Sequence, residues 1–244
     1  MAIFAFIPAR FQSSRFPGKP LAPIAGKPMI QHVWERAARC EAFTRVVVAT
    51  DDQRIAACVE EFGGKAVMTD AAHRSGTDRI CEAALKTGVR DGDIVVNIQG
   101  DQPLLEPTMI TELVGPLLED DTVPMSTLKW RMRDSSDIAN TNHVKVVTDL
   151  NGFALYFSRH PIPFYRQNDT EEIVFKHLGL YAYRMGFLVR YTRLPEGRLE
   201  SAEKLEQLRA LENGFKIKVT ETSCNSTEVD VPEDIPKVEK HLVG

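Results

Sequence analysis

Residues 2–20, AIFAFIPARFQSSRFPGKP, place an apolar run directly before a loop rich in cations. The run at 2–7 predicts a buried strand, because it consists of apolar residues without a single charge. Three prolines and one glycine stiffen the loop at 8–20, which contains no acidic residue. Its cations are Arg10, Arg15 and Lys19. Stiff cations at the carboxyl end of a strand suit a polyphosphate, and a solvated basic loop is the alternative.

The same alternation of apolar runs and amphipathic stretches continues along the first half of the chain. Further apolar runs rich in Val and Ile lie at 44–49, 65–69 and 94–98. Apolar residues spaced by three and four predict helices at 28–40, 52–62 and 78–87. This order predicts a parallel, doubly wound α/β sheet, in which ligands bind beyond the carboxyl ends of the strands.

The second half of the chain has more strands and fewer helices. Expected strands lie at 144–149, 153–158, 176–184 and 215–221. One helix is expected at about 201–213, with Leu205, Leu208 and Leu211 as its apolar stripe and Asn213-Gly214 as its end. We therefore expect a single α/β domain over 1–244, whose later half adds an antiparallel extension.

Composition excludes several classes of protein. The chain has 244 residues, 43% hydrophobic and 26% charged, with a net charge of −4. That mild acidity argues against nucleic-acid binding and membrane-surface binding, and no apolar run is long enough for membrane insertion. The N-terminus is expected to be a first strand rather than a signal peptide. Four scattered cysteines without a CxxC motif predict reduced thiols of a cytoplasmic protein, and P-loop and GxGxxG motifs are absent.

Two aspartates are candidate metal ligands. Asp101 ends the strand at 94–98 in the sequence Gln99-Gly100-Asp101, where it could hold Mg²⁺ beside a triphosphate or could be a turn residue. Asp230 could supply a second carboxylate to the same ion. Glu233 and Asp234 are expected to be structural residues at the start of a last helix. Asp91-Gly92-Asp93 precedes its strand and is expected to be a turn.

Two further sets of polar residues are candidate contacts for a nucleotide or a sugar. Residues 74–79, RSGTDR, open a helix, with Thr77 or Asp78 as N-cap or with the whole stretch as a cradle for a base or sugar. The second set suits an acidic polyhydroxylated substrate. It comprises Arg159, His177, Tyr181, Glu206 and Gln207. A structural role for His177 and a solvated position for Glu206 are the alternatives.

Taken together, these segments resemble the CMP-Kdo synthetases, the 3-deoxy-manno-octulosonate (Kdo) cytidylyltransferases. The resemblance extends from Ile7 to Asp234. Its motifs are SRFPGKPL at 14–21, ATDD at 49–52, SGTDR at 75–79, ALYFSR at 154–159 and LEQLR at 205–209. It implies a cytoplasmic, Mg²⁺-dependent homodimer with a Rossmann-like nucleotidyltransferase fold, mainly parallel with an antiparallel dimerisation extension. The implied reaction is CTP + Kdo → CMP-Kdo + diphosphate, for lipopolysaccharide biosynthesis.

The resemblance also implies roles for individual residues. Asp101 and Asp230 would bind the metal, and Lys19 would act with them in catalysis. The nucleotide would contact Arg10, Arg15, Lys19, Ser75, Gly76, Thr77 and Asp78. The sugar would contact Arg79, Gln99, Arg159, His177, Tyr181, Glu206 and Gln207. Nucleotide binding would fall to about 1–125, sugar binding and dimerisation to about 126–244, and 153–166 would contribute to the dimer interface.

Three segments depart from the usual pattern of that family. They are Gln102 in place of a common Glu, Ser226-Thr227-Glu228-Val229 in place of a glycine-containing turn, and Gly197-Arg198-Leu199. They resemble the branch that uses the 8-amino analogue of Kdo, and Glu228 would suit its ammonium group. Both sugars therefore remain open. A nucleotide-sugar glycosyltransferase and a noncatalytic nucleotide-binding regulator are more remote alternatives.

Overall fold

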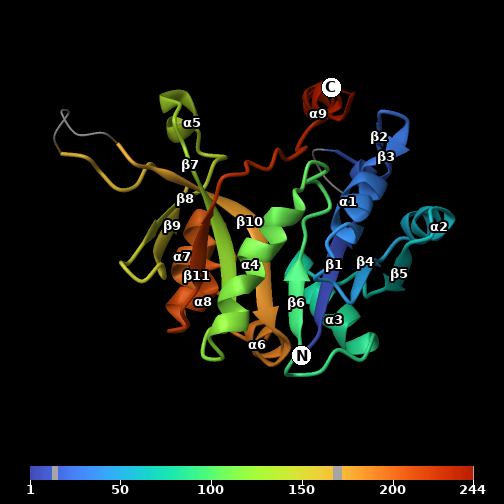
Figure 1. The fold of residues 1–244 in the computed structure, drawn as a ribbon, viewed down its shortest axis with the longest axis horizontal. Coiled ribbons are helices and arrows are strands. Elements are labelled where there is room, and N and C mark those ends of the chain that lie inside the picture. The colour runs from blue at the N-terminus through green and yellow to red at the C-terminus, as the bar shows by residue number, and fades with distance from the viewer. Residues whose placement is uncertain (13–15, 167–171, 244) are drawn as a thin grey trace. The chain divides into compact units, whose positions relative to one another are not determined.

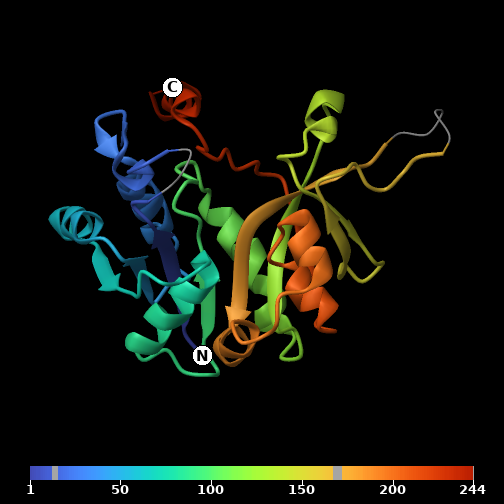
Figure 2. The ribbon, with the colours of Figure 1, turned by 180° about the vertical axis from the view of Figure 1, so that it is seen from behind.

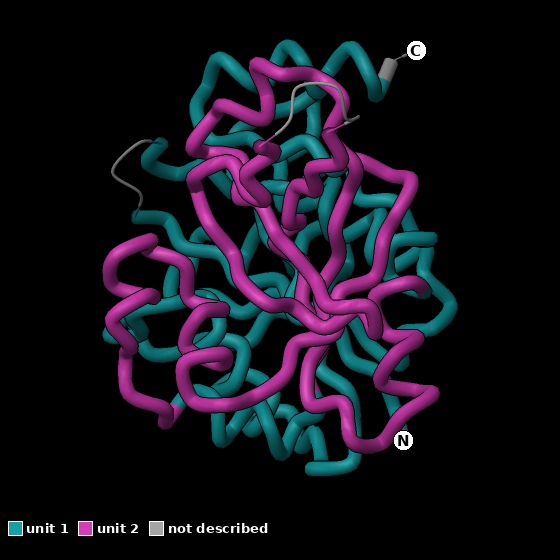
Figure 3. The backbone as a smooth tube through the Cα atoms, turned by 90° about the vertical axis from the view of Figure 1, so that its left-hand side faces the viewer, with its two compact units in different colours: residues 1–111, 184–192, 226–244 teal, residues 112–183, 193–225 magenta. Residues whose placement is uncertain are grey.

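A computed structural model describes residues 1–12, 16–166 and 172–243, which form two compact units. Unit 1 comprises residues 1–111, 184–192 and 226–244, and unit 2 comprises residues 112–183 and 193–225 (Figure 3). The predicted halves were consecutive in sequence, whereas these units are not. The chain leaves unit 2 after residue 225, so Asp230 belongs to the same unit as the first loop.

Unit 1 contains the predicted parallel sheet. Its strands are β1 (Ile3–Ala9), β4 (Arg45–Thr50), β5 (Lys65–Met68) and β6 (Ile94–Asn97). All pairs are parallel in the order β6-β1-β4-β5 (Figure 1). β6 is buried along its whole length, as expected for a strand covered on both faces. Because the strands are parallel, their carboxyl ends share one edge of the sheet.

The helices predicted from apolar spacing at 28–40, 52–62 and 78–87 and the expected last helix form in unit 1, together with a helix at 185–191 that was not predicted. They are α1 (Met29–Ala38), α2 (Gln53–Glu61), α3 (Gly76–Lys86), α6 (Met185–Tyr191) and α9 (Ile235–Val243), with short 3₁₀ turns at Lys19–Leu21 and Pro232–Asp234 and a two-strand ribbon of β2 (Pro23–Ile24) and β3 (Lys27–Pro28). α3 packs on β1 and can be followed from behind in Figure 2. The expected N-cap of α3 was wrong, because Ser75 accepts the hydrogen bond from the backbone N–H of Asp78.

Unit 2 contains the expected antiparallel strands together with one that the sequence analysis missed. The strands are β7 (Met125–Arg131), β8 (Lys145–Thr148), β9 (Ala154–Ser158), β10 (Phe175–Arg184, whose last residue lies in unit 1) and β11 (Lys218–Thr222). The missed strand, β7, runs antiparallel to β10 and parallel to β11. β8 pairs antiparallel with β9 and β10. The extension is therefore antiparallel apart from the pair of β7 and β11.

The helix predicted at 201–213 is two short helices. α7 (Arg198–Glu203) ends at Lys204, which has a left-handed φ of 54°, and α8 (Leu208–Glu212) begins four residues later. The Glu212 carboxylate accepts backbone hydrogen bonds from Leu199 and Glu200, which caps the start of α7. The other helices outside unit 1 are α5 (Ser135–Ala139) and α4 (Pro107–Glu119), which begins within unit 1.

Two expectations from composition are confirmed for the described part of the chain. All four cysteines are free thiols, with Cys40 and Cys81 buried. Among the described residues, no helix has the length and apolar character needed to cross a bilayer.

Candidate functional site

The carboxyl end of β1 lies against the loop that carries Asp101. A Cβ atom added to Gly100 would stand 2.9 Å from the carbonyl oxygen of Pro8, so this loop passes closer to β1 than a side chain allows. β6 pairs with β1 in parallel up to Asn97, which lies opposite Phe6. Asp101 therefore follows its strand at the same edge of the sheet where the cationic loop begins, as the sequence predicts.

Lys19 joins three segments that lie far apart in the chain. Its ammonium group donates to Asp101 Oδ2 at 2.6 Å and to the carbonyl oxygen of Val229 at 3.0 Å. The backbone N–H of Val229 in turn donates to the carbonyl oxygen of Asp101 at 2.9 Å. Asp230 is the next residue, with its Cα about 3.8 Å from that of Val229. The structure therefore brings Lys19, Asp101 and the segment of Asp230 together, whereas a metal ion shared by the two carboxylates stays a prediction.

The Asp234 side chain fixes the backbone at Asp230 by hydrogen bonds. Its Oδ2 accepts hydrogen bonds from the backbone N–H groups of Asp230 and Val231, at 3.1 and 3.2 Å. Burial alone would raise the pKa of Asp234, but hydrogen bonds from Lys237 and from these backbone groups outweigh it and lower the pKa. The structural role expected for Asp234 is confirmed. Asp93 is also structural, because its carboxylate accepts from the backbone N–H groups of Ala2 and Arg90.

The cationic loop closes on itself. The backbone N–H of Gly18 donates to the carbonyl oxygen of Phe11 at 2.8 Å, and Gly18 has a φ of 72°, which favours glycine. The Arg54 guanidinium carbon stands 3.3 Å from the centre of the Phe11 ring. Arg10, directly after β1, is half-buried, whereas Arg15 lies outside the described residues.

The start of α3 is the second element at this edge. A Cβ atom added to Gly76 would stand 3.2 Å from Cγ of Pro8, so the helix N-terminus lies directly against the end of β1. Helix N-termini present backbone N–H groups and a partial positive charge to anions. Ser75 and Asp78 are partly exposed here, whereas Thr77 is buried. A nucleotide contact from this stretch stays a prediction.

Arg79 is held inside unit 1, and its assignment to the sugar stays a prediction. Its side chain is completely buried. Its guanidinium group donates to Thr69 Oγ1 at 2.5 Å and to Asp51 Oδ2 at 2.8 Å. A buried guanidinium needs such partners, because desolvating it without them is costly. Arg79 therefore ties α3 to the loops that follow β4 and β5.

Two of the three departures from the family pattern contact each other. Gln102 is fully buried, and its Nε2 donates to Glu228 Oε1 at 3.3 Å. Ser226 is also fully buried, and its hydroxyl oxygen has no hydrogen-bond partner among the described residues. This contact could not be predicted from the sequence, because 126 residues separate Gln102 from Glu228.

His177, on β10 in unit 2, is a buried neutral ring. Its Nε2 lies 2.9 Å from Thr127 Oγ1 on β7, and its ring meets Phe157 edge-on at 4.9 Å between centroids. Tyr181 lies 5.4 Å from the same ring. Burial lowers the pKa of His177 to about 3, with a smaller contribution from Lys176. The structural reading of His177 is therefore supported, and a sugar contact stays a prediction.

Arg159 is held by the backbone of unit 2. Its guanidinium group donates to the carbonyl oxygens of Glu203 at 2.7 Å, Thr141 at 3.1 Å and Lys204 at 3.4 Å. The Glu203 carboxylate accepts from the Arg159 backbone N–H at 2.9 Å and from Ser158 Oγ at 2.6 Å. This role of Glu203 could not be predicted from the sequence, because a glutamate in a helix gives no local signal of its hydrogen-bond partners.

The remaining residues assigned to the sugar lie in two places. Glu206 and Gln207 stand between α7 and α8 rather than on a continuous helix. Gln207 is buried, and its Nε2 has no hydrogen-bond partner among the described residues. Gln99 lies in unit 1, directly before the close approach at Gly100.

Asp101 and Asp230 of unit 1 are the carboxylates predicted to bind magnesium, and this metal site stays a prediction. Within residues 1–12, 16–166 and 172–243, no three or more His, Cys, Asp and Glu side chains gather as a metal site. Mg²⁺ commonly takes only one or two carboxylates, with phosphate oxygens and water as its other ligands. The side chain of Asp101 is 25% exposed and Asp230 is half-buried, so both are accessible.

Comparisons with known proteins agree with this geometry. A family model described as cytidylyltransferase matches residues 4–218. This chain belongs to the cytidylyltransferase family. The cytidylyltransferase match covers the loop after β1 and the strands of unit 2 up to the first residue of β11, and it sets aside the glycosyltransferase and regulator alternatives.

Three relatives of this cytidylyltransferase are informative. A 3-deoxy-manno-octulosonate cytidylyltransferase of Geobacter sulfurreducens is 54% identical over 252 residues, covering 99% of this chain and 100% of that protein. An 8-amino-3,8-dideoxy-manno-octulosonate cytidylyltransferase of a Shewanella species is 54% identical over 246 residues, covering 100% of both. A solved CMP:2-keto-3-deoxy-manno-octonic acid synthetase complexed with CTP has a TM-score of 0.93 and 43% identity, covering 100% of this chain and 99% of that one. The resemblance to CMP-Kdo synthetases and the nucleotidyltransferase fold are confirmed.

Proposed function

We propose that this enzyme transfers the cytidylyl group of CTP to Kdo or to its 8-amino analogue, releasing diphosphate. The observation that carries the proposal is the joining of Lys19, Asp101 and the backbone of Val229 at the end of β1. This arrangement places a cation and carboxylates at the edge where α/β sheets bind nucleotides. The relatives that share the sequence over its whole length are named for these two sugars.

The residues of unit 1 would act by position and charge. Transfer of a phosphoryl-type group needs little covalent chemistry from the protein, so placing the reactants and stabilising charge supply most of the rate. Arg10, Arg15 and Lys19 would neutralise the phosphate oxygens and the leaving diphosphate. The sugar's anomeric hydroxyl would attack the α-phosphorus of CTP, and the bond to the diphosphate oxygen would break.

Asp101 and Asp230 would hold Mg²⁺ during this reaction. When bound, the ion supplies charge stabilisation to the α-phosphate and acidifies a coordinated hydroxyl. The Lys19 ammonium group donates to Asp101 Oδ2 at 2.6 Å, and its positive charge balances that of the carboxylate. Asp234 fixes the backbone of Asp230 through its two hydrogen bonds and so limits where that second carboxylate can stand.

Replacing either aspartate tests this assignment. We expect Asp101→Asn and Asp230→Asn to lower kcat by about 100-fold or more, measured as diphosphate release from CTP and Kdo with Mg²⁺. Asp91→Asn, at an exposed turn, is the control and should keep wild-type turnover. Wild-type turnover in Asp101→Asn would refute the metal assignment. Absence of diphosphate release by the unmodified enzyme with either sugar would refute the reaction itself.

The contact between Gln102 and Glu228 favours the 8-amino sugar as a second candidate substrate. The amide of the buried Gln102 donates to the Glu228 carboxylate at 3.3 Å. This hydrogen bond orients a negative charge in the segment that leads to Asp230. A carboxylate held in this way complements an ammonium group, which the 8-amino sugar has and Kdo lacks.

The two sugars can be compared directly. We expect Glu228→Gln to lower kcat/KM for the 8-amino sugar roughly tenfold, because a charged hydrogen bond is lost, and to leave kcat/KM for Kdo nearly unchanged. Glu233→Gln, an exposed neighbour in the same segment, is the matched control. An unchanged ratio of the two kcat/KM values would refute the role of Glu228 and leave cytidylyl transfer standing.

We also propose that the enzyme acts in the cytoplasm as a homodimer. Four free cysteines support a reducing compartment. β9 supports the dimer, because among the described strands it pairs with β8 alone and it exposes Leu155. An exposed apolar strand at a sheet edge is usually covered by a partner.

A further inference from the structure

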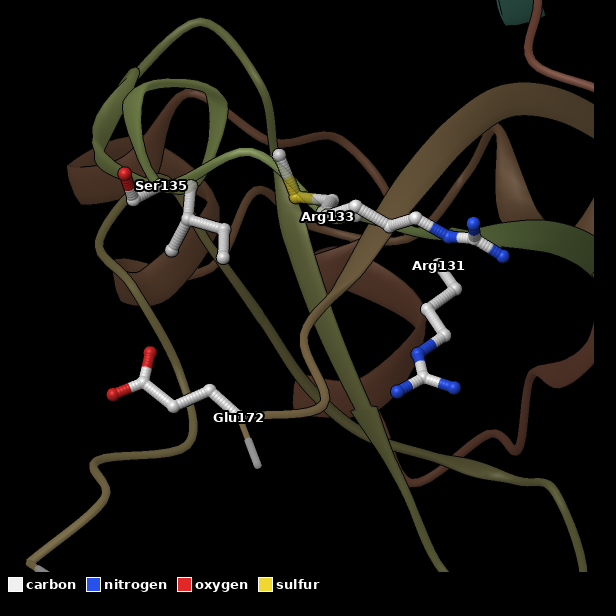
Figure 4. A pocket seen from close by; sticks show the side chains of 6 residues that line it. Arg131, Arg133, Ser135 and Glu172 are labelled. Atoms are coloured by element: carbon white, nitrogen blue, oxygen red, sulfur yellow. The ribbon is translucent and has the colours of Figure 1, made fainter. Parts of the chain in front are cut away.

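Two arginines lie where β7 ends. Arg131 is the last residue of β7, and Arg133 follows two residues later. The intervening Met132 is buried. Figure 4 shows the Arg131 and Arg133 side chains extending in different directions from the end of β7, with Ser135 and the Glu172 carboxylate on the other side of the pocket. None of these residues belongs to the nucleotide or sugar sets.

Both arginines line each of two cavities in unit 2, and each cavity has a volume of about 500 Å³. The first is completed by Met132, Ser135, Ile138 and Glu172. The second is completed by Trp130, Glu221, Thr222 and Ser223. Each volume is large enough for a small ligand with its first hydration waters.

The second cavity lies where two parallel strands end together. β7 and β11 are parallel, with Thr222 opposite Trp130 at the last pair of the register. The carboxyl ends of parallel strands are the usual ligand-binding edge of an α/β sheet. Thr222 Oγ1 accepts a hydrogen bond from the backbone N–H of Cys224 at 3.1 Å, which leaves its own proton free to be donated.

The charges of this cavity favour an anion. Its two guanidinium groups face a single carboxylate, that of Glu221. Glu221 lies opposite Lys129 in the register of β7 and β11, and its charge partly opposes the lowering of the Lys129 pKa by burial. The Glu221 carboxylate therefore interacts electrostatically with the Lys129 ammonium group. Arg133 is exposed and forms no ion pair within the part of the chain that the structure describes.

We propose that Arg131 and Arg133, with the hydroxyl groups at the end of β11, bind a small dianionic oxyanion of the phosphate type. The guanidinium group of each arginine can donate two parallel hydrogen bonds to the oxygens of such an anion. The Thr222 and Ser223 hydroxyls add neutral donors on the opposite wall. The proposal does not depend on the cytidylyl transfer reaction.

Trp130 provides the readout, because it lines the cavity and is one of only two tryptophans. In a Trp34→Phe background its fluorescence can be followed while inorganic phosphate is added to the full chain. Sodium chloride at matched ionic strength separates binding from screening. We expect a saturable change that Arg133→Gln weakens roughly tenfold or more, since a charged contact is lost. Arg193→Gln, an exposed arginine elsewhere in unit 2, should leave the dissociation constant unchanged.

Repeating the phosphate titration with saturating CTP distinguishes binding in this cavity from binding at the residues assigned to the nucleotide phosphates. We expect the response of Trp130 to phosphate to persist with CTP present. Loss of the response with CTP would overturn the proposal, and so would equal dissociation constants for Arg133→Gln and Arg193→Gln. A response that sodium chloride reproduces at the same ionic strength would also overturn it.

Discussion

Lys19 shows how much a single side chain can organise. Its ammonium group binds Asp101 across 82 residues and Val229 across 210. The sequence predicted that Lys19 and the two aspartates would converge, because each comes after a predicted strand. It did not predict that Lys19 would bind Asp101 directly, since hydrogen-bond partners depend on distances that no local pattern records.

His177 gives a prediction about stability at the residue scale. Burial lowers its pKa from 6.5 to about 3, so the folded chain keeps the ring neutral where the unfolded chain protonates it. The stabilisation is complete above the unfolded pKa and is lost as the pH falls from about 6.5 toward 3. Between pH 6.5 and about pH 5, we expect the free energy of unfolding to fall by about 1–2 kcal/mol from this residue.

Urea unfolding at these two pH values measures that change. His177→Phe should be less stable at pH 6.5, because the Thr127 hydrogen bond is lost, but its stability should depend less on pH. The exposed His241→Gln should keep the wild-type dependence. Equal pH slopes in His177→Phe and wild type would show that His177 is not buried in the neutral form.

At the scale of elements, close approaches of the backbone place the site. The loop after β6 reaches the end of β1 only because Gly100 has no side chain. The N-terminus of α3 reaches the same point at Gly76. These contacts explain why residues from different elements share one edge, and they could not be read from periodicity, which reports burial rather than distance.

Gly100→Ala tests this close approach. The new methyl group would stand 2.9 Å from the Pro8 carbonyl oxygen, so the backbone must shift. We expect a loss of about 1–3 kcal/mol in the free energy of unfolding and a fall in kcat, because Asp101 moves with the loop. Gly92→Ala, at a turn with nothing within 4 Å of the added atom, is the matched control. Similar stability and turnover in the two variants would contradict the packing account.

At the scale of the whole molecule, unit 1 is built from three separate stretches of the chain. The last stretch, 226–244, brings Asp230 back to the loop of Asp101 after all of unit 2 has been formed. The residues assigned to the metal and the nucleotide would therefore come from both ends of the chain, and a truncation before residue 226 removes one carboxylate.

The exposed edge of unit 2 gives a prediction about assembly. Leu155 on β9 is 62% exposed, and its strand pairs with β8 alone among the described strands. We expect Leu155→Asp to convert a dimer to a monomer in light scattering coupled to gel filtration, because a charge would be buried at the interface. Leu85→Asp is the control, since Leu85 is 56% exposed on α3 in unit 1. A wild-type chain that is monomeric, or a Leu155→Asp variant that stays dimeric, would refute this interface.

The amino-acid sequence alone was enough for the parallel sheet of unit 1, for strands β8, β9, β10 and β11 of unit 2, and for the positions of Lys19 and Asp101 after the carboxyl ends of β1 and β6. These follow from periodicity and chain order, which are local properties. Tertiary structure alone decided that Arg79 is buried on Asp51, that the helix expected at 201–213 breaks at Lys204, and that Gln102 contacts Glu228. Each of these depends on which distant residues pack together, and burial and hydrogen bonding are set by those neighbours rather than by adjacent sequence.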